Sequence, residues 1–106
     1  MELLQGTLDV MILRTLLFSP AHGHAIAKHI QRTSDDVLQV ETGSLYPALH
    51  RLEAGGAISS SWEHSEKGKR AKYYKLTPSG RRLLLKQLSR WEQVSAAVSR
   101  VLQPVE

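Results

Sequence analysis

The sequence predicts a small, mainly α-helical domain that carries one β-hairpin and ends in a long helix. Three observations favour this fold class. The chain has 106 residues, the length of one domain with one modest core. Apolar residues recur at helical spacing in four segments. Between residues 57 and 76, two stretches rich in β-forming residues flank a glycine turn, as in a hairpin.

The first helix is expected from Leu3 to Phe18, up to the break at Pro20. Its apolar residues cover more than one face: Leu4, Leu8, Met11 and Phe18 form one stripe, and Val10, Leu13 and Leu17 widen it. A helix that is apolar on several faces is buried on several sides. In so small a domain, this pattern indicates a second subunit.

A short second helix is expected after Gly23, with Ile26 and Ile30 on its apolar side. It ends in the polar cluster at residues 33–36. The brief apolar run at residues 37–40 is then expected to form a turn that packs on the core.

The third helix is expected to begin among the capping residues at 41–44 and to run to about Ala54. A cap at Gly43 or Ser44 would place Pro47 in the first turn, where its missing N–H costs little. The spacing predicts a buried stripe of Leu45, Leu49 and Leu52, and it turns Tyr46, His50, Arg51 and Glu53 outward. Gly55 and Gly56 terminate the helix.

The hairpin is expected from strands at residues 57–64 and 71–76, joined by a turn at residues 65–69 that is centred on Gly68. Alternation places Tyr74 on the same face as Leu76, toward the core. The tip of this hairpin is basic.

The last helix is expected to begin with Thr77 as its N-cap and Pro78 at its first position, and to run to about Leu102. Positions 84, 88, 91, 95, 98 and 102 are spaced like a coiled-coil seam. A helix of about 24 residues is roughly 36 Å long. It would leave an apolar stripe exposed unless something covers it, and the simplest cover is a second copy of the chain.

The charge distribution points to a polyanionic partner. The net charge is +4, but nine of the 14 basic residues and none of the ten acidic ones lie between Lys67 and Arg90. The rest of the chain is therefore mildly acidic. A basic segment on an acidic body favours binding to nucleic acid, although such a run can also be a solvated surface.

Several classes of site have little support. The absence of cysteine excludes a disulfide scaffold, a cysteine-ligated zinc site and a thiol nucleophile. No nucleophile elbow, paired carboxylates or glycine-rich phosphate loop is present, so we expect no enzyme, no catalytic residues and no cofactor. His22, His24 and His29 lie close in sequence, but capping or surface imidazoles are favoured over a metal site.

The N-terminus lacks the pattern of a signal peptide, and the apolar stretches are too short to span a membrane. The expected location is the cytoplasm, with no membrane contact.

In combination, the second and third helices form a helix-turn-helix, and the hairpin forms its wing. We expect residues 1–77 to be a winged helix-turn-helix DNA-binding domain and residues 78–106 to be a C-terminal dimerisation helix, in one structural unit. The expected DNA-binding residues are Thr42, Ser44, Tyr46, Pro47, His50 and Arg51 of the third helix and Lys67, Lys69, Arg70 and Lys72 of the wing. The expected dimer interface is formed by Leu4, Leu8, Met11, Leu84, Leu88, Trp91, Val94, Val98, Val101 and Leu102.

The sequence resembles the PadR family of bacterial transcriptional regulators. Residues 43–53, which read G-S-L-Y-P-A-L-H-R-L-E, with Gly56 and Ile58, are similar to the signature of that family. Residues 70–80, R-A-K-Y-Y-K-L-T-P-S-G, resemble its wing and the start of its last helix. The opening G-T-L-D-V-M-I-L and the turn P-A-H-G also fit. The similarity covers about residues 3–102.

This resemblance implies a winged-helix homodimer that binds a palindromic operator on double-stranded DNA in the bacterial nucleoid, usually as a repressor. The single helix after the wing is similar to the short form of the family. In drug-sensing relatives, a Trp of the last helix stacks on flat aromatic ligands between the subunits, and Trp91 lies at the matching place. Trp91 is therefore a candidate for binding a small aromatic effector, although an aromatic residue at a seam more often serves packing.

Two further readings stay open at the level of the sequence. Tyr73 and Tyr74, between basic residues, could form a stacking platform for RNA or single-stranded nucleic acid. A protein-only dimerisation module is a third reading, but it gives the basic segment no role.

Overall fold

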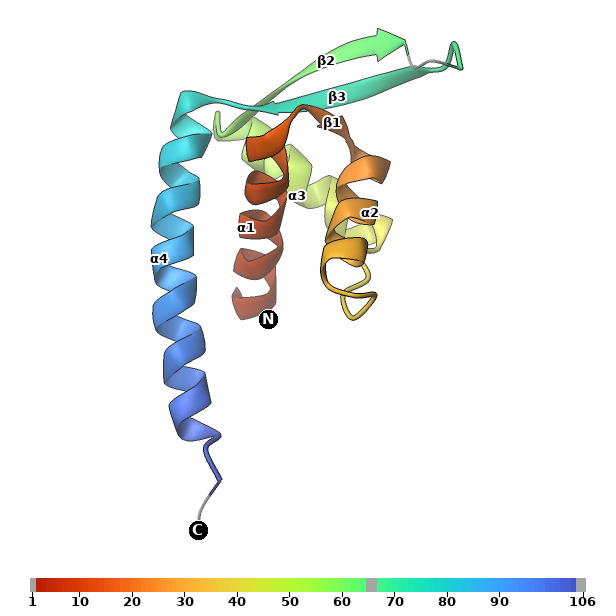
Figure 1. Cartoon of the computed structure of the whole chain (residues 1–106). Coiled ribbons are helices and arrows are strands. Elements are labelled where there is room, and N and C mark those ends of the chain that lie inside the picture. The colour runs from red at the N-terminus through yellow and green to blue at the C-terminus, as the bar shows by residue number, and fades with distance from the viewer. Residues whose placement is uncertain (1, 65–66, 105–106) are drawn as a thin grey trace.

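The computed structural model describes residues 2–64 and 67–104, with side chains from Gly6 onward. The described elements are α1 (Glu2–Phe18), β1 (Ala21–His22), α2 (Gly23–Thr33), α3 (Thr42–Ala54), β2 (Ile58–His64), β3 (Arg70–Leu76) and α4 (Pro78–Val101). The helices lie on one side of a small antiparallel sheet, and α4 extends well past the end of α1 (Figure 1). The predicted fold class, a mainly helical winged helix-turn-helix with a long last helix, is confirmed.

The core lies where α1 meets α2, α3, the sheet and the first half of α4. Its fully buried large side chains come from every one of these elements: Ile12, Leu13, Ile26, Leu45, Leu49, Ile58 and Leu84. The central helix is α1, whose apolar residues face several neighbours, as its composition predicts. The buried stripe of α3 is also confirmed, with Ala48 added to the three leucines.

The sheet has three strands in the order β1–β3–β2, and β1 was not predicted. This strand holds only two residues, Ala21 and His22, which pair with Tyr74 and Tyr73 of β3. A two-residue strand has no periodicity to detect, because its hydrogen bonds come from a partner far along the chain. The predicted hairpin itself is confirmed, with Ser60 opposite Tyr74 and Trp62 opposite Lys72. Residues 65 and 66 of its turn lie outside the described part of the chain.

The start of α3 differs from the prediction. The N-cap position is Glu41, so Thr42, Gly43 and Ser44 already form the first turn. The backbone carbonyl of Glu41 accepts hydrogen bonds from the amides of Ser44 and Leu45 at 3.0 and 2.9 Å, and its side chain makes no capping bond. The expected cap at Gly43 or Ser44 is therefore wrong, and Pro47 lies in the second turn.

Two segments flank α3, the glycine turn after it and the run at residues 37–40 before it. At the end of α3, the amide of Ala57 donates to the Leu52 carbonyl and that of Gly56 donates to the Glu53 carbonyl, with Gly56 at φ +81°. This motif confirms the predicted glycine stop. The run at residues 37–40 is only partly as expected, because Val37 is 80% exposed and only Val40 packs against the core.

The last helix is tied to the turn after α3. The Thr77 hydroxyl lies 2.6 Å from the Gly56 carbonyl oxygen and 2.9 Å from that of Ala57, and it accepts a hydrogen bond from the Gly80 amide as the predicted N-cap. From this junction α4 extends so far that the chain measures 60 × 29 × 23 Å along its principal axes. Among the described residues, no helix combines the length and hydropathy needed to cross a bilayer.

Candidate nucleic-acid interface

The exposed face of α3 is the first part of the candidate interface. The buried stripe holds one side of this helix against the core, so the other side faces solvent. The candidate residues on that helix are all exposed: Thr42, Ser44, Tyr46, Pro47, His50 and Arg51. Short polar side chains at the helix start, followed by an aromatic, an imidazole and a guanidinium, can reach phosphates and base edges.

Tyr46 is positioned by close packing on the start of α2. A Cβ atom built at Gly23 would lie 2.8 Å from the Tyr46 hydroxyl oxygen and 3.0 Å from its ring. The glycine therefore lets the ring lie against the backbone of the preceding helix. This contact joins the two helices of the helix-turn-helix and leaves Tyr46 half exposed on the outer face.

Arg51 is held on one side of α3 by an acidic partner that the sequence does not reveal. Its Nη2 lies 3.0 Å from the Asp9 carboxylate on α1. Burial raises the pKa of Asp9, and the nearby guanidinium opposes that rise. The ion pair fixes the helix against α1 and gives Arg51 a defined starting direction, while its side chain stays 43% exposed.

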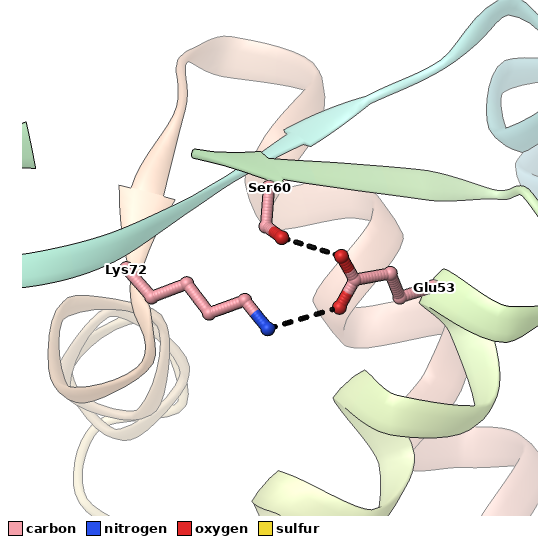
Figure 2. A network of polar contacts seen from close by, with 3 residues as sticks. All are labelled: Glu53, Ser60 and Lys72. Atoms are coloured by element: carbon pink, nitrogen blue, oxygen red, sulfur yellow. Dashed lines mark hydrogen bonds and ion pairs between the residues drawn. The ribbon is translucent and has the colours of Figure 1, made fainter. Parts of the chain in front are cut away.

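Glu53, in the last turn of α3, links the helix to both strands of the wing (Figure 2). Its carboxylate accepts a short hydrogen bond from the Ser60 hydroxyl of β2, and it lies 3.3 Å from Lys72 Nζ of β3. The Ser60 hydrogen bond, with a smaller contribution from Lys72, lowers the pKa of this carboxyl. Lys72, expected to bind phosphate, is thus held in an intramolecular ion pair.

The wing supplies the second part of the candidate interface. Lys67, Lys69 and Arg70 are exposed around the tip, where Gly68 adopts a φ of +77°. The Arg70 guanidinium lies over the ring of Trp62, with its carbon 5.1 Å from the ring centroid. The basic segment that the sequence shows as continuous is divided in space, because the wing tip and α4 lie at opposite ends of the hairpin (Figure 1).

The tyrosines of β3 do not form a stacking platform. Tyr74 is buried in the core, as its strand parity predicts. The ring of Tyr73 is half buried and packs edge-on against His22, with centroids 5.4 Å apart. With Tyr74 buried, the two rings cannot form a joint stacking platform for single-stranded nucleic acid.

His22 caps α2, and His24 and His29 lie beside other aromatic rings. The Nδ1 atom of His22 accepts a hydrogen bond from the Ala25 amide at 3.1 Å and caps the helix. The ring of His24 is nearly parallel to that of His22, with centroids 6.3 Å apart, and His29 lies near Phe18. Among the described residues, no three histidine or carboxylate side chains converge on a metal-sized site.

A groove between α1 and α4 contains the candidate effector residue. It has a volume of about 440 Å³ and is lined by Gly6, Thr7, Val10, Gln87, Arg90, Trp91 and Val94. Trp91 is 40% exposed, so part of its ring is open to the groove. A flat apolar wall with a neighbouring arginine suits a planar ligand, and the same surface suits packing against another helix.

Of the expected dimer residues, Trp91 and Val94 line this groove. Those of the others whose side chains are described fall into three groups. Leu84 lies in the core of the single chain, because α4 packs its first turns on α1 and the sheet, and it offers no surface to a partner. Leu8, Met11 and Leu88 are partly buried against that core. The distal residues Val98, Val101 and Leu102 are exposed, and Val101 most of all at 82%. Leu4 lies outside the residues whose side chains the structure describes.

Three residues of this region escaped prediction from the sequence. Asp9 reads as an interruption of an apolar helix, and its partner Arg51 is 42 residues away. Glu53 reads only as an outward side chain of α3. The exposure of Trp62 could have been predicted, since an aromatic residue on the distal part of a short hairpin lies beyond the core.

A family model described as "Transcriptional regulator PadR-like family" matches residues 12–86. The chain is 29% identical over 97 residues to a transcriptional regulator of Mycobacterium tuberculosis. The aligned segment covers 92% of this chain and 87% of the relative.

Solved structures agree with this match. A PadR family regulator from Eggerthella lenta is 33% identical, with coverage of 98% of this chain and 88% of that one and a TM-score of 0.78. A transcriptional regulator from Clostridium thermocellum is 27% identical, with coverage of 97% and 100% and a TM-score of 0.87.

Proposed function

This chain belongs to the PadR-like family of transcriptional regulators, and from that premise we propose that it is a homodimeric repressor of a palindromic operator. Regulators of this family act by binding DNA and are not enzymes. The observation that carries the proposal is the combination of an exposed, polar α3 face with a basic wing on the same small module.

In the proposed complex, α3 enters the major groove and the wing tip lies along the adjacent backbone. Tyr46, Pro47 and His50 face the bases, and the first-turn residues Thr42 and Ser44 position the helix on a phosphate. Arg51 leaves or shares its pair with Asp9 to reach a base edge. Lys67, Lys69 and Arg70 bind phosphates, while Lys72 holds the wing to α3 through Glu53.

The proposed dimer forms through α4. The distal half of this helix carries exposed apolar residues along the seam, beyond the part that packs on its own α1. A second copy related by twofold symmetry covers them and brings two α3 helices to one face of the duplex, which explains a palindromic operator. Residues 1–77 then act as the DNA-binding domain and residues 78–106 as the dimerisation helix.

The proposed effector is a small planar aromatic compound that binds beside Trp91. The groove lies between α1 and α4, so it borders the proposed dimer interface. A ligand that fits one spacing of the subunits better than another shifts the distance between the two recognition helices. Release from the operator follows from this difference in affinity.

Footprinting of the purified chain on the DNA upstream of its own gene tests the proposed function. The expected result is a protected site with twofold symmetry, whose half-sites lie one helical turn or a multiple apart. A duplex of that site should bind much more tightly than a scrambled duplex at physiological salt. Equal affinity for both duplexes would exclude sequence-specific regulation by this chain.

A further inference from the structure

We propose that Trp62, on wing strand β2, is a DNA-contacting residue that works as a pair with Arg70. Its ring holds the guanidinium in place and packs its own exposed surface on the sugar–phosphate backbone. The inference rests on the proposed function, because it requires binding to duplex DNA. It adds a contact that neither charge nor helical spacing indicates.

The register of the hairpin fixes where Trp62 lies. Trp62 is opposite Lys72, and the next pair on the same face is His64 and Arg70. Closer to the core, this face carries Ile58 and Tyr74, which are both buried. Toward the tip, the hairpin extends beyond the helices (Figure 1). Trp62 is 58% exposed. The large aromatic ring of Trp62 is thus exposed to solvent, because this part of the strand lies beyond the core.

Arg70 restricts what that ring can do in the free protein. The guanidinium carbon lies 5.1 Å from the ring centroid, within the range of a cation–π interaction. A stacked guanidinium stays charged and keeps its N–H donors at the edge of the ring, available to an oxygen acceptor. Because fewer rotamers remain to be lost on binding, the stack prepares Arg70 to bind a phosphate.

The surroundings of Trp62 favour a polyanion over an apolar protein partner. Lys67, Lys69 and Arg70 are exposed nearby in the wing. Lys72 is directly opposite on the same face, where it pairs with Glu53. Glu63, the described carboxylate of β2, points to the other face and hydrogen-bonds Ser61. Nucleic acid is recognised by this combination, since cations bind phosphates while an aromatic ring packs on the sugar or base.

A backbone contact of this kind carries no sequence information. We therefore expect Trp62 to strengthen binding to every duplex by a similar factor. Trp62→Ala should weaken binding about fivefold, the effect of roughly 1 kcal/mol from a partly exposed cation–π pair and ring contact. Trp62→Phe should retain most of the affinity because it keeps a ring under Arg70.

The test uses two short fluorescein-labelled duplexes of unrelated sequence, one rich in A·T pairs and one of mixed composition. Fluorescence anisotropy gives the affinity of the wild type, Trp62→Ala, Trp62→Phe and the control Ser61→Ala, which changes the opposite face of the same strand. The affinities of Arg70→Gln and of the double variant Trp62→Ala with Arg70→Gln complete a double-mutant cycle. Trp62→Ala should cost less when Arg70 is already removed, because part of its effect acts through that side chain.

A second arm leaves the wing unchanged. The chain has two tryptophans, so Trp91→Phe makes Trp62 the sole tryptophan emitter. Either unlabelled duplex should reduce acrylamide quenching of Trp62 by about twofold or more, as expected for a ring about half covered on binding. This arm decides the question even if the alanine variant is unfolded.

The outcomes separate this inference from the proposed function. Unchanged quenching together with unchanged affinity of Trp62→Ala, in protein that binds both duplexes, overturns the role of Trp62 alone. Failure of the wild type to bind either duplex even at low salt overturns the backbone contact, while the proposed function is tested separately by the footprint. A loss of affinity on only one duplex overturns the backbone contact, because it shows that Trp62 reads sequence.

Discussion

Gly80 lies where α4 meets the turn that follows α3, and a side chain at this position has no room. A Cβ atom there would overlap the Ala57 carbonyl oxygen and lie 2.8 Å from the carbonyl carbon and 2.9 Å from Leu76 Cδ1. Since Ala57 also accepts hydrogen bonds from Thr77, its carbonyl cannot move without loss of the cap. The close packing of α4 on this turn therefore requires a glycine at position 80.

Gly80→Ala should therefore destabilise the fold by about 3 kcal/mol, at the upper end of overpacking effects. Thermal unfolding followed by circular dichroism should show a midpoint lower by roughly 13 °C or more. Gly43→Ala is the matched control, because a Cβ atom there meets no atom within 4 Å. An unchanged midpoint for Gly80→Ala would show that the turn after α3 yields easily.

Glu53 should make the stability of the chain depend on pH. The folded-state pKa of this carboxyl is below its ordinary value, mainly because of the Ser60 hydroxyl and then Lys72. Its stabilisation is complete above the ordinary glutamate pKa of about 4.3, and it is lost as the pH falls through the lower folded value. The side chain is about one-third exposed, so its polar contacts contribute about 1 kcal/mol or less.

The measurement is the unfolding midpoint of the wild type and of Glu53→Gln between about pH 6 and pH 3, the range that spans the ordinary pKa. The difference between the two proteins should shrink as the pH falls. Asp9 titrates in both proteins, so its raised pKa cancels in the difference. A difference that stays constant with pH would assign the Glu53 effect to packing alone.

At the scale of the elements, the wing should contribute charge without sequence preference. Lys69 is exposed next to the glycine turn and lies outside the Glu53 network. Lys69→Gln should weaken binding to specific and scrambled duplexes alike and reduce the slope of log K against log salt by about one unit.

Anisotropy titrations over a range of salt concentrations measure this slope. The comparison variant is Lys75→Gln, which removes an exposed charge nearer to α4, on the face of β3 opposite to that of Arg70 and Lys72. Its slope should match the wild type. If Lys75→Gln lowers the slope and Lys69→Gln does not, DNA lies along the sheet rather than at the wing tip.

The elements were predictable where the signal is local. The start of α4 has a threonine and a proline in their preferred places, and the stop of α3 has two glycines, so both boundaries match the sequence. The start of α3 has several capping residues in a row, and preference alone favoured Ser44 over Glu41. The observed N-cap instead rests on the backbone alone, because the Glu41 carbonyl accepts hydrogen bonds from the amides of Ser44 and Leu45 without a side-chain cap.

At the scale of the whole molecule, the orientation of the candidate site residues was predictable from the sequence, but their contacts were not. Which α3 residues face outward follows from the spacing of its leucines, and Tyr74 follows from strand parity. The partners of those residues do not follow, because Asp9 meets Arg51 and Glu53 meets Lys72 only after distant elements pack. Charge counted along the sequence also misleads, since the basic segment is divided between the wing and α4.

A second copy of the chain should be needed to cover α4. Val98→Asp with Val101→Asp places two charges on its exposed distal stripe, at little cost to the single chain because Val98 is about half exposed and Val101 almost wholly so. Sedimentation should change from dimer to monomer at micromolar concentration, while circular dichroism keeps its helical signal. Ser89→Asp with Ser99→Asp adds the same charge outside the stripe and should leave the dimer intact. A dimer that tolerates both pairs forms through another surface.

The groove at Trp91 gives the last prediction. With Trp62→Phe, Trp91 is the sole tryptophan emitter, and planar aromatic compounds should quench it as they stack on the ring. A compound that lowers operator affinity by some factor must itself bind the DNA-bound protein more weakly by the same factor, since the two equilibria are linked. Measuring operator affinity and Trp91 quenching for the same compound identifies an effector that acts at this groove. Quenching with no change in operator affinity, or a change in operator affinity without quenching, leaves Trp91 as a packing residue of the proposed interface.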